Sequence, residues 1–80
     1  MISAEQIKAA RALVGMKQEE LATLSGLSGQ TIKRMESLGT GRSSAANVDA
    51  VTRALEAAGV QFIPENGGGA GVRLAKPKSV

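Results

Sequence analysis

Three residues in the first half of the chain, Ala22, Gly26 and Ile32, follow a spacing that restricts how their surroundings fold. A small side chain such as Ala22 lets two helices approach closely. Gly26 lies four residues later and permits a tight turn, because glycine accepts a positive φ without a steric clash. Ile32 lies six residues further on, where a β-branched side chain packs the second helix against the first. The spacing therefore predicts two helices joined by a turn of three or four residues.

Hydrophobic periodicity and capping residues predict further helices on both sides of this pair. Ser3 and Gln6 have the spacing of a capping box, which predicts the start of a first helix. The Gly/Ser/Thr-rich stretch 39–44 is typical of an exposed loop, and Ser44 or Asn47 can cap the helix that follows it. The four predicted helices cover residues 4–14, 18–25, 28–38 and a last segment that ends near residue 58.

The composition changes after residue 59, and the remainder of the chain predicts a β-hairpin followed by a basic tail. Residues 60–63 and 72–74 are short β-prone runs that flank a Gly-rich turn. One interpretation is that this hairpin packs on its own helices, and the other is that it pairs with a second copy. A lone hairpin is marginal in water and its edges invite pairing, so we favour a homodimer. The predicted interface consists of Val60, Phe62, Ile63, Val72 and Leu74.

We therefore expect three parts: a helical domain over residues 1–59, a dimerisation hairpin over 60–75 and a tail over 76–80. The chain contains neither Cys nor His, which leaves only carboxylates for a transition-metal site and removes imidazole catalysis. No paired carboxylates, nucleophile–base pair or phosphate-binding loop is visible. We expect no enzyme activity, no metal, no cofactor and no membrane segment, in a cytoplasmic protein. The net charge of +3 favours polyanionic partners.

The segments Gln18-Glu-Glu-Leu-Ala22 and Gly26-Leu-Ser28, with Thr31, Ile32 and Glu36, resemble the helix-turn-helix family of phage repressor and Cro type. This family is also called the xenobiotic-response-element or lambda-repressor-like family. The resemblance covers residues 3–58 and does not include the hairpin. It implies a mainly α bundle of four to five helices, usually dimeric, whose third helix enters the major groove of double-stranded DNA.

The resemblance also implies roles for individual residues. Base-reading positions fall at Gly29, Gln30, Lys33 and Arg34. The phosphate-side positions that match the family are Gln18, Thr31 and Arg42, and to these we add Lys17, Ser28 and Thr40 as further predicted phosphate contacts. Arg11 and Glu36 match an ion pair that ties the first helix to the third. The chain departs from the family at Lys17, which replaces a capping side chain, at Gly29, which has no side chain to read a base, and after the third helix, where Arg42 is the one arginine.

These observations predict a sequence-specific transcriptional regulator of the repressor type that binds a palindromic operator as a homodimer. The alternative is an antitoxin-type interaction module that neutralises a protein partner and regulates its own operon. Co-purification with a second chain would distinguish the alternative from the favoured interpretation.

Overall fold

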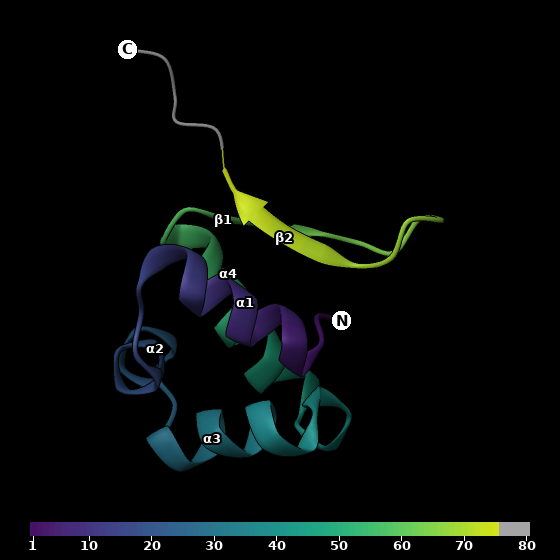
Figure 1. The fold of residues 1–80 in the computed structure, drawn as a ribbon. Helices are drawn as coiled ribbons and strands as arrows, with labels where there is room; N and C mark the ends of the chain where they lie inside the picture. Colours follow the sequence, from purple (N-terminus) through teal and green to yellow (C-terminus); the bar gives the residue numbers. More distant parts are fainter. Residues whose placement is uncertain (76–80) are drawn as a thin grey trace.

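The computed structural model describes residues 1–75, and the predicted basic tail at 76–80 lies outside the described residues. Helices make up the first three quarters of the described chain and an antiparallel hairpin completes it (Figure 1). In chain order the elements are α1 (Ala4–Val14), α2 (Gln18–Ser25), α3 (Gly29–Leu38), the 3-10 turn η1 (Thr40–Arg42), α4 (Ala45–Ala57), β1 (Val60–Ile63) and β2 (Gly71–Leu74). The predicted mainly helical fold with a C-terminal hairpin is confirmed.

Capping interactions fix where the helices begin and end. The Ser3 hydroxyl accepts from the Gln6 backbone N–H, and the Gln6 side chain accepts from the Ser3 N–H, so the predicted capping box starts α1. Gly26 ends α2 with a φ of 73°, a left-handed conformation that other residues adopt only with strain. Of the two predicted caps for α4, Ser44 is the one used, since its hydroxyl accepts from the Asn47 N–H.

The core lies between the four helices and is built from aliphatic side chains and methionine. Each helix contributes at least one side chain with essentially no exposure: Ile7, Leu21, Ile32, Met35, Val51 and Leu55. Burying a side chain of this size contributes about 1.5–3 kcal/mol. Ala22 is also buried, on α2, which packs against both α3 and α4. None of the helices within residues 1–75 is long and apolar enough to cross a membrane.

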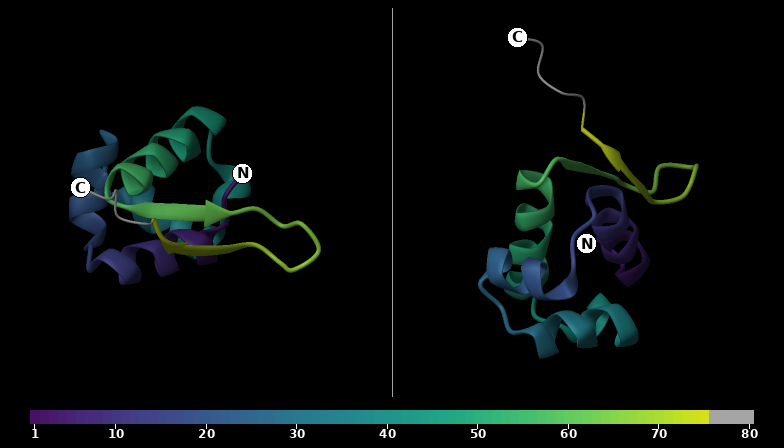
Figure 2. Two further views of the ribbon diagram at one scale, coloured as in Figure 1. Left: turned by 90° about the horizontal axis from the view of Figure 1, so that it is seen from above. Right: turned by 60° about the vertical axis from the view of Figure 1, so that its left-hand side comes forward.

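The hairpin lies over α1 and α4, on the opposite side of the helical layer from α3 (Figures 1 and 2). Its register pairs Val60 with Leu74 and Phe62 with Val72, so these four side chains share one face. Val60 belongs to the buried core, and Phe62 and Val72 pack against it. The hairpin therefore packs on the helices of its own chain, while its pairing with a second copy stays a prediction.

Gln6 fastens the hairpin to α1. Its side-chain Nε2 donates to the backbone carbonyl of Gly71 at 3.0 Å and to that of Ile63 at 3.4 Å, one from each strand. Its Oε1 accepts from Ser3, so one buried amide caps α1 and holds both strands. The sequence indicated only the capping role, because the partners in the hairpin lie about sixty residues away.

Candidate nucleic-acid interface

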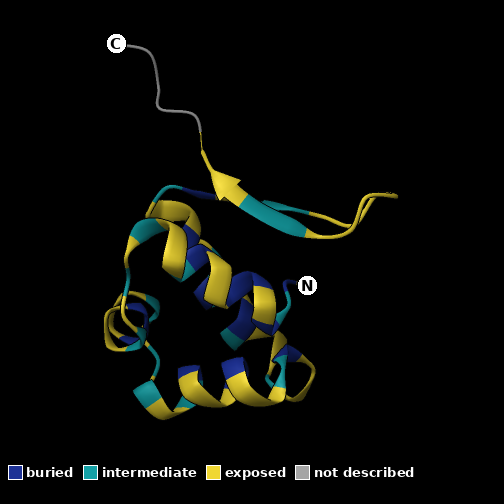
Figure 3. Ribbon diagram, viewed as in Figure 1, coloured by how far each residue is buried: buried dark blue, intermediate teal, exposed yellow. Residues whose placement is uncertain are grey.

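Helix α3 has one side buried against the core and the other exposed to solvent (Figure 3). Ser28 begins the helix by accepting from the Thr31 N–H at 3.1 Å, and the two side-chain hydroxyls lie 2.9 Å apart. Exposed residues follow at the spacing i, i+3, i+4 and i+7, which is one side of a helix: Gln30, Lys33, Arg34 and Ser37. Within residues 1–75, neither Lys33 nor Arg34 forms a salt bridge. Their charges are therefore open to an anionic partner.

Arg11 and Glu36 form the contact that fixes α3 relative to α1. Arg11 Nε donates to Glu36 Oε2 at 2.6 Å and its second guanidinium N–H group donates to Oε1 at 2.7 Å, a bidentate arrangement. A third donor of Arg11 reaches the Met16 carbonyl. The hydrogen bond to Glu36 raises the pKa of Arg11, because it stabilises the charged guanidinium, while partial burial opposes the rise.

Gln18, predicted to contact phosphate, uses part of its side chain inside the fold. Its Nε2 donates to Glu36 Oε1 at 3.1 Å, so the carboxylate of Glu36 joins α1, α2 and α3. Gln18 is also the first residue of α2, and its backbone N–H has no partner within the helix. Any phosphate contact by Gln18 therefore falls to this backbone N–H group and to the second hydrogen of the side-chain Nε2.

The N-terminus of α2 is suited to an anion because of Lys17. An ammonium group has no lone pair with which to cap backbone N–H groups, so Lys17 leaves them without a side-chain acceptor. The backbone N–H of Lys17 donates a hydrogen bond to Glu20 Oε1 at 3.1 Å. The exposed Lys17 ammonium and the positive end of the helix dipole both favour negative charge here.

Thr40 does not fit the phosphate contact predicted for it. The residue is only 8% exposed, and its hydroxyl donates to the Ile2 carbonyl at 2.7 Å. The hydroxyl instead holds the N-terminal segment against η1. Arg42, at the end of the same turn, is exposed and free of salt bridges within residues 1–75. The predicted basic residue after α3 thus remains available to a phosphate.

The other predicted residues fall in two places. Gly29 is the first residue of α3, with open space where a side chain would project. Of the five predicted dimer residues, Ile63 is half-buried and Leu74 remains 55% exposed after the hairpin has packed. Sequence reasoning did not single out Ser37 and Leu38, although both are exposed on α3. Ser37 could have been found from the sequence, because it follows Gln30 by seven residues and therefore lies on the same side of the helix as Gln30 and Arg34.

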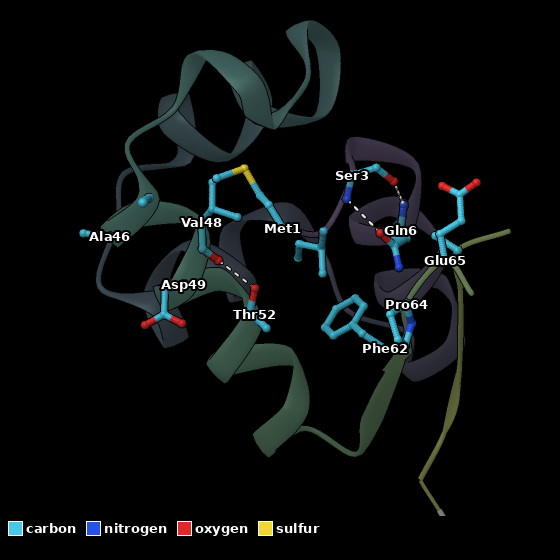
Figure 4. Close-up of a pocket in the computed structure, with 13 residues that line it drawn as sticks. Met1, Ser3, Gln6, Ala46, Val48, Asp49, Thr52, Phe62, Pro64 and Glu65 are labelled. Carbon is cyan, nitrogen blue, oxygen red and sulfur yellow. Dashed lines mark hydrogen bonds between the residues drawn. The ribbon is translucent and has the colours of Figure 1, made fainter. Parts of the chain in front are cut away.

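A groove of about 970 Å³ opens between the N-terminal segment, the first half of α4 and the hairpin (Figure 4). Its lining includes the apolar side chains of Ile2, Val48 and Phe62. The amide of Gln6 is bonded to the backbone, as described, and the Thr52 hydroxyl donates to the Val48 carbonyl. Within residues 1–75, no group of three or more carboxylates lies close enough to hold a metal ion.

One comparison with known proteins, against family models, agrees with this geometry. No curated protein matches the chain. A family model described as helix-turn-helix matches residues 7–59, about two thirds of the chain, and this range contains all of α2, α3, η1 and α4. The chain belongs to the helix-turn-helix family of the phage repressor and Cro type, a family of DNA-binding regulatory domains.

Proposed function

We propose that this protein is a sequence-specific transcriptional regulator that inserts α3 into the major groove and binds a palindromic operator as a homodimer. The observation that carries the proposal is the division of α3 into two faces. Ile32 and Met35 are fully buried and Glu36 is held by Arg11, whereas the polar side chains face solvent. A helix so anchored presents its outer side chains without loss of core contacts.

Within this proposal the exposed residues divide into two roles. Gln30, Lys33 and Arg34 read base edges, because amide and guanidinium groups match the donors and acceptors of adenine and guanine. The phosphate contacts come from Lys17, from the start of α2 and from Arg42, with the hydroxyls of Ser28 and Thr31 at the start of α3. These groups fix the position of the helix and carry no sequence information themselves.

The position of the hairpin restricts which dimer serves this function. The hairpin lies on the side opposite α3, so stacking two hairpins on their outer faces would direct the reading helices away from each other (Figure 2). A two-fold axis perpendicular to the sheet keeps both α3 helices on one side. Among the described residues the sheet has only two strands, so each strand has an unpaired edge. We therefore propose edge-to-edge pairing of two hairpins, with the exposed Leu74 covered by the partner.

The test is selection of bound duplexes from a random pool, followed by measurement of affinity and stoichiometry. We expect a two-fold symmetric consensus, two chains per duplex, and a preference over random DNA of at least about a thousandfold. Recovery of no consensus would contradict sequence-specific binding, and one chain per site would contradict the dimer. If the protein instead co-purifies with a second chain at its native expression level and selects no DNA, the antitoxin-type alternative replaces the proposal.

A further inference from the structure

Leu38 is an exposed apolar residue on the otherwise polar outer side of α3. It is the last residue of the helix and is 58% exposed, whereas Ile32 and Met35, which anchor the helix, have essentially no exposure. It follows Arg34 by four residues, so the two side chains are neighbours on the helix surface. Arg42 is the last residue of η1, the 3-10 turn that follows α3. Leu38 therefore lies beside Arg34 on the helix surface and, along the chain, four residues before Arg42, and we assign both of these cations to DNA contacts.

We propose that Leu38 reads a thymine through its C5-methyl group. The inference rests on the proposed function, since it requires α3 to lie in the major groove. Base edges there present hydrogen-bond donors and acceptors, and the thymine methyl is the apolar group among them. An exposed leucine carried into the groove loses contact with water, and only a methyl group offers it an apolar partner.

Helix geometry sets where this thymine lies. Four residues advance about 6 Å along a helix, and successive base pairs are about 3.4 Å apart. When α3 lies along the groove, the thymine is one or two base pairs from the base contacted by Arg34. An arginine commonly contacts guanine. Each half-site of the operator therefore contains a guanine and, one or two base pairs away, a thymine.

The experiment replaces each thymine of the selected duplex, one position per half-site at a time, by deoxyuridine. This substitution removes only the methyl group and keeps the hydrogen-bonding edge. Affinity is measured by fluorescence anisotropy at one salt concentration for the wild type, for Leu38→Ala and for Leu24→Ala. Leu24 is the matched control because it is a leucine of similar exposure, 60%, on α2.

We expect one position at which deoxyuridine weakens wild-type binding about fourfold per half-site, the equivalent of one buried methyl group. Leu38→Ala binds both duplexes equally, and Leu24→Ala retains the fourfold difference. Leu38→Met, which remains apolar, also retains a difference, and thermal melts verify that each variant is folded. If Leu38→Ala is the one variant that loses the affinity difference between the thymine and deoxyuridine duplexes, the methyl contact belongs to Leu38.

Two results would overturn the inference while leaving the proposed function intact. One is a wild-type protein that binds its selected duplex specifically and is insensitive to deoxyuridine at every position. The other is a Leu38→Ala variant that keeps the full difference, which would assign the methyl contact to another residue. Failure to select any duplex would remove the proposed function, and this inference with it.

Discussion

Arg11 and Glu36 join α1 to α3 through two parallel hydrogen bonds of 2.6 and 2.7 Å. The Glu36 side chain is 5% exposed and also accepts from Gln18. The Glu36 carboxylate belongs to α3 and is held by Arg11 of α1 and Gln18 of α2. These contacts fix the orientation of α3 relative to the other two helices. We therefore expect the orientation of α3 relative to α1 and α2 to depend on Glu36, a buried residue outside the proposed DNA-binding surface.

Replacing Glu36 by alanine should destabilise the fold more than it alters base preference. The change leaves the partly buried Arg11 charge without its partner and removes the acceptor of Gln18. Breaking a fully buried pair from one side costs about 3–5 kcal/mol, and we expect a loss at or below the lower end because Arg11 is 21% exposed. Urea unfolding at pH 7 measures it. Since the pKa of Arg11 is raised, its contribution is complete at pH 7 and disappears only at strongly alkaline pH.

The exposed pair of Arg53 and Asp49, one turn apart on α4, supplies the control for this measurement. Both side chains are more than half exposed, so Asp49→Ala should change the free energy of unfolding by less than about 1 kcal/mol. Equal losses from Glu36→Ala and Asp49→Ala would contradict the structural role of Glu36.

Arg34→Ala and Gln30→Ala should each relax selectivity at particular base pairs. A bidentate contact to a base contributes about 1–3 kcal/mol of discrimination, and neither side chain is needed by the core. Repeating the duplex selection with each variant measures the effect position by position. An Arg34→Ala variant that selects the wild-type consensus unchanged would show that α3 does not read bases through this residue.

Arg42→Ala should weaken binding to all sequences alike. A lost phosphate contact reduces the dependence of log affinity on log salt by about one unit per half-site. Affinities at several salt concentrations, for operator and random duplexes, measure the slope. Arg53→Ala removes the same charge from α4, where Asp49 already pairs with it, and should leave the slope unchanged. An Arg42→Ala slope equal to that of the wild type would place Arg42 outside the interface.

Lys17→Ser should raise stability and lower DNA affinity at once. A serine at this position can accept from the open N–H groups of α2, which contributes about 0.5–2 kcal/mol. The same change removes an ammonium group from the helix end where we place a phosphate. Thermal melts and affinity measurements should therefore move in opposite directions. A variant that binds operator as tightly as the wild type would contradict the phosphate contact at this helix.

Leu74→Lys should convert the dimer to a monomer without unfolding it. Leu74 is more than half exposed in the single chain, so the charge is tolerated by the monomer but conflicts with a covered strand edge. Sedimentation at micromolar concentration measures the change, with Leu24→Lys as the control, because Leu24 is a leucine of similar exposure on α2 rather than on the hairpin. If the wild type sediments as a monomer and binds DNA as one copy per site, the dimer is wrong.

The helical part of the fold could be predicted from sequence because its signals are local. The capping box at Ser3 and Gln6, the glycine at 26 and the apolar periodicity act within a few residues, and the helices begin and end near the predicted positions. Contacts between distant segments were beyond such reasoning. The exposed loop predicted after α3 contains Thr40, whose burial depends on the carbonyl of Ile2, thirty-eight residues away. The alternation of apolar and polar residues likewise predicts the two faces of the hairpin. It does not predict that α1 and α4 cover one of these faces.

Because α3 has one buried side and one exposed side, its exposed residues can change during evolution while the fold is kept. Only Ile32, Met35 and Glu36 of this helix are buried, and the other seven residues are partly or fully exposed. Substitutions among Gln30, Arg34 and Leu38 can therefore accumulate with little effect on folding, while each one alters the surface that we propose contacts DNA. Gene duplication followed by drift at these positions would produce regulators of new sites on an unchanged scaffold.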